Sequence, residues 1–315
     1  MKFSDLMLDM ATGDASMHDA YIQESVGKIN VSAAIFETAR KISELPDGEF
    51  LVVQEAADAG LPTDKEGATC VACEAVKQSV TAFYDLVAQT AKKMKAASEK
   101  DMKALIAIGK KLGVSTDGDF KQSFVPALSK AILASEKKLA LPDKRFLKGK
   151  YSEDIADCYG NSMANFLSAF GVTMSVGDYK SRKDVSTFKD VKKNIAAGAK
   201  QANFDKTVNK DRHYTDTVSA SDIEALAEAI FDVMNVSKAV AEATAGGAKK
   251  NALTMVNSLC DKEDCNGHFV SRALEGIVDG IKTATANLTA ITENTTKAFT
   301  DSVYALSAKM TGGQN

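Results

Sequence analysis

The residues best suited to chemistry gather in one short stretch, Cys260-Asp261-Lys262-Glu263-Asp264-Cys265-Asn266-Gly267-His268. Two thiols and an imidazole this close together suggest zinc, and the C-x2-C pair Cys70 and Cys73 could supply further ligands. Zinc ligands usually come from tight loops, however, and the C-x2-C pair falls within a predicted helix. Three alternatives therefore stay open, with the first favoured: free thiols, a Cys260–Cys265 disulfide, or a zinc site on Cys70, Cys73, Cys260, Cys265 and His268.

Other motifs with known chemistry are missing from the sequence. It has no dinucleotide or phosphate loop, no G-x-S-x-G and no H-E-x-x-H. The histidines His18, His213 and His268 are scattered, and none stands in the E-x-x-H pattern of a di-iron bundle. The acidic loop after Cys260 does not follow the EF-hand spacing. We therefore expect no catalytic residue and no cofactor, and we interpret the protein as a non-enzyme.

The composition indicates which elements must position these residues. The 315-residue chain is 45% hydrophobic and 26% charged, which is typical of a globular protein. It contains 47 Ala, only 4 Pro and no Trp. Because alanine favours helices and proline breaks them, this composition predicts a largely helical fold.

Helical spacing of apolar residues recurs along most of the chain. The predicted fold is all-α, an elongated multi-helix bundle with a long C-terminal helix over about 267–310 and at most a minor β element near 171–183. The other predicted helices cover about 15–45, 48–59, 65–98, 100–112, 127–139, 152–170, 184–201, 221–244 and 248–260. We expect the core to include Ile22, Ile29, Phe36, Val80, Phe83, Phe166, Ile230, Ile277, Leu288 and Phe299.

Local signals predict how the chain is divided. The polar segment 204–220 is the best candidate for a linker between a helical region over 1–203 and another over 221–315, although both can also belong to one domain. Asp14 and Ser16 are candidate N-caps for the first helix, and Ser221 to Glu224 fits a capping box. Tyr159, Tyr214 and Tyr304 are interpreted as packing residues with solvated hydroxyls.

Charge is distributed in blocks, although the net charge is only −3. Residues 1–60 hold 4 basic against 11 acidic residues, whereas 89–112 has a net charge of +5 and 137–206 a net charge of +6. The favoured interpretation is solvated helix faces, and the alternatives are pairing of acidic and basic surfaces between copies and contact with packaged nucleic acid through 137–206. Lysine predominates and aromatic residues are not interleaved, so such a contact would not be sequence-specific.

These features predict a structural rather than a chemical role. We expect a non-enzymatic structural or assembly protein that packs through helical surfaces in a multi-copy complex, with a virus or phage particle as the most economical setting. The alternatives are a helical adaptor for one protein partner and a metal-dependent enzyme with an unrecognised site. No signal peptide or membrane span is visible, so we expect a soluble protein made in the cytoplasm.

Overall fold

The computed structural model describes residues 3–45, 65–136, 149–169, 175–176, 179–180, 188–202, 219–261 and 267–311. Within these residues the chain is almost entirely helical, which confirms the predicted all-α bundle and its long C-terminal helix. The α-helices are α1 (Phe3–Ser43), α3 (Lys65–Lys111), α4 (Val125–Glu136), α5 (Gly149–Ser168), α6 (Phe188–Ala202), α8 (Ala220–Ala243), α9 (Lys249–Cys260) and α10 (Gly267–Thr311). Two π-helical turns, η2 (Phe120–Phe124) and η4 (Thr244–Ala248), precede α4 and α9.

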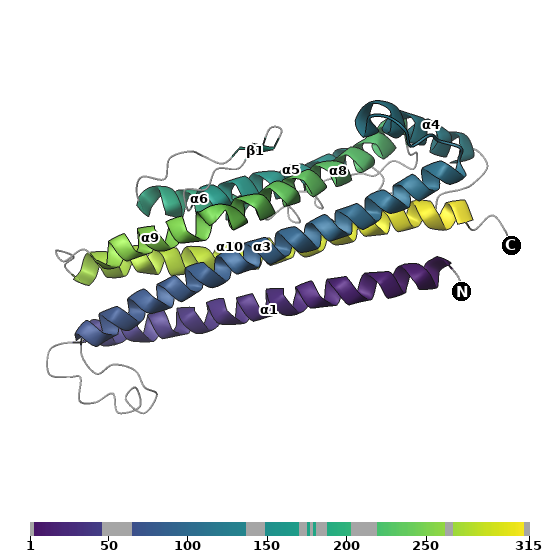
Figure 1. Cartoon of the computed structure of the whole chain (residues 1–315). Coiled ribbons are helices and arrows are strands. Elements are labelled where there is room, and N and C mark those ends of the chain that lie inside the picture. Colours follow the sequence, from purple (N-terminus) through teal and green to yellow (C-terminus); the bar gives the residue numbers. More distant parts are fainter. Residues whose placement is uncertain are drawn as a thin grey trace.

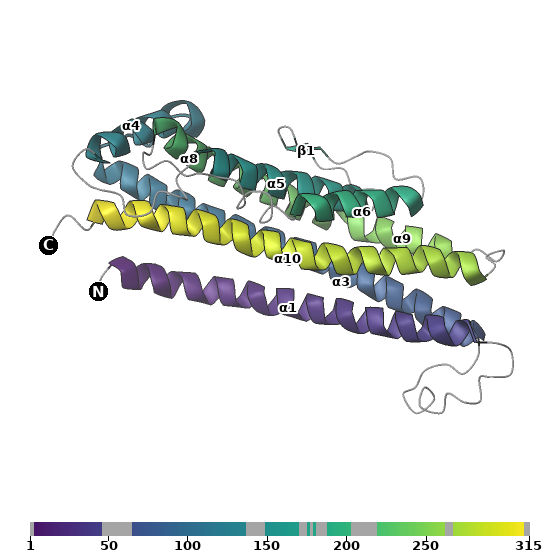
Figure 2. The same ribbon diagram turned by 180° about the vertical axis from the view of Figure 1, so that it is seen from behind.

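The helices form an elongated bundle of three layers (Figures 1 and 2). The long helices α3 and α10 lie side by side in the middle layer, with α1 along one edge and the helices α5, α6, α8 and α9 on the opposite side. Helix α1 runs antiparallel to α3 and α10, so that the start of α1 lies at the same end of the bundle as the end of α10. Helix α1 thus has one covered side and one outer side.

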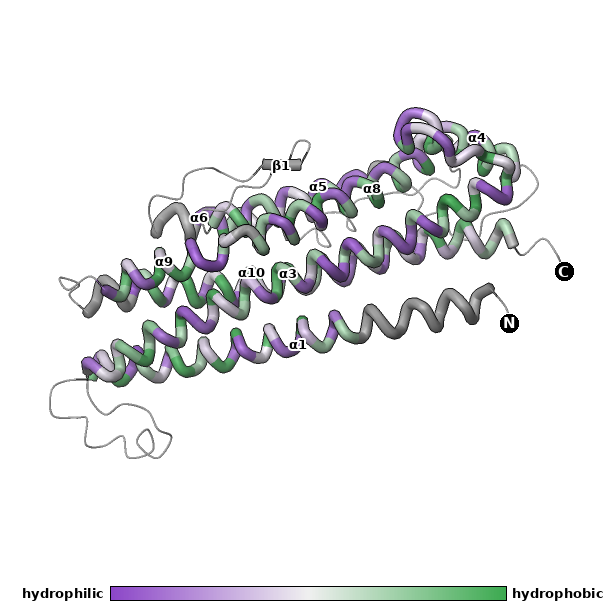
Figure 3. The backbone as a smooth tube through the Cα atoms, viewed as in Figure 1, coloured by the Kyte–Doolittle hydropathy of each residue, from purple (hydrophilic) through white to green (hydrophobic). Residues whose placement is uncertain are grey.

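One hydrophobic core runs through the bundle and contains residues from both predicted regions. Every residue of the predicted core is buried, from Ile22 on α1 to Phe299 on α10. Apolar and polar stretches alternate along the helices in Figure 3, as expected where each helix buries one face. The linker interpretation of 204–220 stays a prediction, because 203–218 lies outside the described residues.

Two long helices extend further than their sequence signals indicated. Helix α1 already begins at Phe3, so Asp14 and Ser16 lie inside it and their prediction as N-caps was wrong. The helices predicted at 65–98 and 100–112 are one continuous helix, α3. No Pro or Gly separates the two predicted segments, and the polar residues Ser98 and Asp101 at the junction are buried against neighbouring helices. The predicted helix at 48–59 lies outside the described residues.

Helix boundaries follow local backbone chemistry. The capping box of α8 uses Ser219 and Asp222, so the predicted box of Ser221 and Glu224, two positions later, was wrong. Both pairs satisfy the same four-residue pattern. Gly113 ends α3 with a φ of 74°, a left-handed conformation that glycine adopts without strain. The predicted separation of the helices over 221–244 and 248–260 is confirmed, because η4 lies between α8 and α9 and contains Gly247 with a φ of 93°.

The only strands in the described residues form a minimal hairpin. β1 (Ser175–Val176) pairs antiparallel with β2 (Tyr179–Lys180), inside the predicted minor β element at 171–183. The helix predicted over about 127–139 begins at Val125 and follows directly on the π-helical turn η2. Among the described helices, none is both long enough and apolar enough to span a membrane.

Candidate functional site

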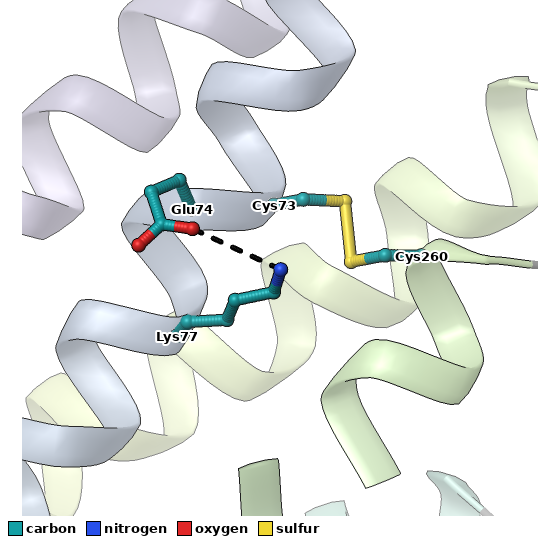
Figure 4. Close-up of a disulfide and its surroundings, with 4 residues drawn as sticks. All are labelled: Cys73, Glu74, Lys77 and Cys260. Atoms are coloured by element: carbon teal, nitrogen blue, oxygen red, sulfur yellow. Dashed lines mark ion pairs between the residues drawn. A yellow bond between two sulfur atoms is a disulfide. The ribbon is translucent and has the colours of Figure 1, made fainter. Parts of the chain in front are cut away.

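The fold brings two of the candidate cysteines together and leaves a third, Cys70, unbonded. Cys73 of α3 and Cys260 at the end of α9 form a disulfide with Cα atoms 6.1 Å apart, across 187 positions of sequence (Figure 4). Cys70 lies one turn earlier on α3, is exposed and carries a free thiol. Cys265 and the side chain of His268 lie outside the described residues.

This pairing changes the interpretation of the thiols. A cysteine forms one disulfide only, so the Cys260–Cys265 bridge is wrong, and Cys260 is not the free thiol that was favoured. Within the described parts of the chain, no three His, Cys, Asp or Glu side chains lie close enough together to hold a metal ion. The five-residue zinc set is not available while this disulfide is intact, because zinc is bound by cysteine thiolates and Cys73 and Cys260 are bonded to each other.

A groove of about 800 Å³ opens beside the disulfide, between α1, α3 and α9. Ion pairs border it: Lys28 lies 2.6 Å from Glu24 on α1, and Lys77 lies 3.8 Å from Glu74, next to the disulfide in Figure 4. The hydrogen bond from Lys28 to Glu24 raises the pKa of the lysine. The groove is lined by Glu24, Gly27, Lys28, Val31, Ser32, Glu74, Lys77, Gln78, Thr81, Ala82, Asp85, Leu253 and Asn257.

The outer side of α1 carries apolar side chains that nothing in the described chain covers. Met17, Tyr21 and Val31 have 52%, 49% and 61% of their surface exposed. They are three of the four exposed large hydrophobic residues in the described parts of the chain, and the fourth is Tyr304 on α10. At 100° per residue, the three α1 residues fall on one face of the helix, together with the Glu24–Lys28 ion pair.

Neither feature was predicted from the sequence. The predicted core residues of α1, Ile22, Ile29 and Phe36, form the stripe that the fold buries. A second series at alternating spacings of four and three is present in the sequence, with apolar residues at both ends and the charged Glu24 and Lys28 at its centre. Only the position of α1 at the edge of the bundle leaves that series on the outside. The groove is lined by residues of three helices, from Glu24 to Asn257, so no local pattern in the sequence predicts it.

A carboxyl group is buried between α3 and α10. Asp101 is 3% exposed and accepts a hydrogen bond of 3.3 Å from the Thr300 hydroxyl. Burial raises the pKa of Asp101 to about 7, since the charged form loses its hydration, and Thr300 and Lys100 oppose this rise while Asp301 adds to it. Asp101 therefore gains and loses its proton near neutral pH while serving a helix–helix contact.

The tyrosines and the described histidine have structural positions. Tyr159 is fully buried, with its hydroxyl 3.0 Å from that of Ser237, so the predicted solvated hydroxyl was wrong, and burial raises its pKa. Tyr304 is 71% exposed rather than packed, and Tyr214 lies outside the described residues. The ring Nδ1 of His18 lies 3.3 Å from Gln89 Oε1 and joins α1 to α3.

Comparison of the chain with protein-family models, with curated proteins and with solved structures found no match in any of the three. The surfaces of the chain itself are therefore the basis for a functional argument. Two of them stand out, the apolar outer face of α1 and the groove that adjoins it.

Proposed function

We propose that the protein is a non-enzymatic structural protein that packs against further copies of itself in a multi-copy complex, with a virus or phage particle as the most economical setting. The observation that supports this proposal is the outer face of α1, where Met17, Tyr21 and Val31 are exposed on one side of an edge helix. Burial of apolar surface contributes about 25 cal/mol per Å², so covering this face would stabilise an assembly.

The ion pairs within the chain favour this apolar face over the charge blocks as the contact between copies. Part of the acidic block of residues 1–60 already pairs internally: Asp19 lies 2.6 Å from Lys93 of α3, and Glu37 lies 2.9 Å from Lys282 of α10. These acids hold α1 on the bundle and are less available to a neighbouring copy. The basic segment 137–206 lies largely outside the described residues, and its contact with nucleic acid stays a prediction.

Light scattering coupled to size exclusion tests the proposal over a range of protein concentrations, at low and high salt. We expect a mass that rises from 33.5 kDa toward multiples of it as the concentration increases. Salt screens exposed charges, so a contact between acidic and basic surfaces would weaken strongly in the high-salt buffer, whereas an apolar contact would persist. A mass of one chain under all conditions would contradict self-assembly by this chain alone.

The groove beside the disulfide favours a second candidate function, that of a helical adaptor for one protein partner. Its volume and its mixed lining, with Val31 and Leu253 among charged and polar residues, suit a short segment of another protein. A monomer that binds one partner and loses binding when Leu253 is changed to Asp would support the adaptor. Self-association that survives this change would favour the structural protein.

A further inference from the structure

Helix α1 carries a regular seam on its outer side. Its positions alternate at spacings of four and three, which is the heptad pattern of a two-helix coiled coil. Glu24 and Lys28 occupy the centre, and apolar side chains occupy both flanks, with Ile35 half-buried and the others exposed. We call this set the α1 seam, and it consists of Met17, Tyr21, Glu24, Lys28, Val31 and Ile35.

We infer that the α1 seam binds the α1 seam of a second copy of this chain, with the two helices antiparallel about a twofold axis near residue 26. Met17 then faces the partner's Ile35, Tyr21 faces the partner's Val31, and Glu24 faces the partner's Lys28. Each contact occurs twice, because a twofold interface uses the same surface on both copies. This inference rests on the proposed self-assembly and specifies its contact.

The order of residues along the seam selects this arrangement. In the stated register, charge faces opposite charge and apolar side chains face apolar side chains. A slip by one heptad places Glu24 against the partner's Ile35 in one direction, or against the partner's Tyr21 in the other. A parallel pair places Glu24 against Glu24 and Lys28 against Lys28, where like charges repel.

Small residues flank the seam and permit a close approach of a second helix. Ala20, Gly27 and Ala34 are exposed and stand seven residues apart, so they share one edge of the outer face. A β-carbon added at Gly27 would meet nothing within 4 Å, so packing within the described chain does not require a glycine there. A glycine inside an exposed helix lowers the stability of that helix. The close passage of a second helix would explain why a glycine stands at position 27.

The groove adds room beside the seam. Glu24, Lys28 and Val31 belong both to the seam and to the lining of the 800 Å³ groove between α1, α3 and α9. Side chains of a partner helix that lie against α1 can therefore enter the groove, where Gln78 and Thr81 of α3 line the opposite wall. This continuity supports a helix, rather than a small ligand, as the occupant.

Site-specific cross-linking tests the register in the full chain. The background carries Cys70→Ser and Cys265→Ser, which removes the exposed free thiol Cys70 and the Cys265 thiol and keeps the Cys73–Cys260 disulfide. We expect Tyr21→Cys and Val31→Cys proteins to form a disulfide-linked heterodimer when mixed and oxidised. Neither variant alone should cross-link efficiently, since ten residues of helix, roughly 15 Å, separate its two thiols.

Either of two outcomes would overturn the arrangement. Efficient cross-linking of Tyr21→Cys with itself would indicate parallel helices. A mixture that forms dimers in solution without the heterodimeric disulfide would indicate that the copies meet through another surface. The same cysteines in unmixed samples serve as the matched control.

Charge reversal tests the central contact by sedimentation equilibrium. Glu24→Lys or Lys28→Glu places like charges opposite each other twice per dimer, and we expect the dissociation constant to rise about tenfold. An equimolar mixture of the two variants restores opposite charges in the heterodimer and should recover wild-type association. The control is Glu99→Lys, which reverses the charge of the exposed Lys95–Glu99 pair on α3 and should leave association unchanged.

The results separate this inference from the proposed function. A protein that stays monomeric at every concentration overturns both. A protein that self-associates with the same affinity after charge reversal keeps the proposed function and overturns the α1 seam as the contact. Recovery of association in the mixture also shows that the single variants are folded.

Discussion

Helices α1 and α10 are of similar length, with 41 and 45 residues, but the bundle treats them differently. α10 packs on α1, α3, α5, α6 and α9, and its apolar stripe is buried from Ile277 to Leu306. α1 packs mainly on α3 and α10, and only one of its two stripes is buried. The position of a helix in the bundle, more than its own apolar content, decides whether all of its apolar residues are buried within one chain.

The polar residues of the two helices reinforce this difference. Several threonines of α10 bond to their own helix, as the Thr292 hydroxyl donates to the Leu288 carbonyl at 2.8 Å, whereas the buried hydroxyls of Thr285 and Thr295 have no hydrogen-bond partner among the described residues. This local bonding lets a helix with many threonines lie in the middle of the bundle without a partner for each hydroxyl. The Glu24–Lys28 pair on α1 stays exposed and can reach another chain.

The largest effect is expected from shortening equivalent apolar side chains on the two helices. Leu288→Ala on α10 removes a fully buried side chain and should lower the free energy of unfolding by about 2–5 kcal/mol. Val31→Ala on α1 should change the free energy of unfolding of the monomer by less than about 0.5 kcal/mol. Urea titration of dilute protein measures both, and equal losses would contradict the comparison.

The disulfide should stabilise the interior without affecting the outer face of α1. Replacing Cys73 and Cys260 by Ala opens a loop of 187 positions and should lower the free energy of unfolding by about 3 kcal/mol under oxidising conditions. Cys70→Ala, one turn away on the same helix, is the matched control and should have little effect. A thermal melt with and without reductant checks this, and identical curves for all variants would contradict it.

The pH dependence should come from the contact between α3 and α10. The pKa of Asp101 rises from 3.8 when unfolded to about 7 when folded, so the folded state holds a proton that the unfolded state has lost. Its contribution to stability is therefore largest below pH 4 and decreases until the pH passes about 7. Asp101→Asn should raise the free energy of unfolding at pH 8 by about 2 kcal/mol relative to wild type and have a much smaller effect near pH 4. Denaturation of both proteins at pH 4, 6 and 8 measures this, and parallel profiles would refute it.

The smallest effect compares one substitution at two glycines. Gly27→Ala on α1 should stabilise the monomer by about 0.5–1 kcal/mol, because the added β-carbon meets nothing and alanine favours the helix. Gly198→Ala on α6 should instead destabilise it, because the β-carbon would overlap the buried ring of Phe166. Melting temperatures of the two variants should move in opposite directions, and a loss of stability in Gly27→Ala would show that the outer face is already covered.

Much of the fold could be predicted from spacing alone. The stripe through Ile277, Leu288 and Phe299 predicted both the long C-terminal helix and its buried face, since residues three and four apart share one side of a helix. Helix boundaries were harder to predict from the sequence. Ser219–Asp222 and Ser221–Glu224 fit the same capping pattern, and only the folded chain shows that α8 begins after Ser219. The continuity of α3 was missed because Asp101, polar in sequence, is buried by a neighbouring helix.

The sequence by itself determined the helical class, the buried stripes and the places where glycine ends a helix, because these depend on residues that are close along the chain. Only the tertiary structure decided that Cys73 meets Cys260, that Asp101 meets Thr300, and that one of the two stripes on α1 stays outside. These outcomes depend on which helices lie side by side, a choice made by packing of the whole core. Local spacing contains no information on that choice, so the candidate contact surface became visible only once the bundle had been assembled.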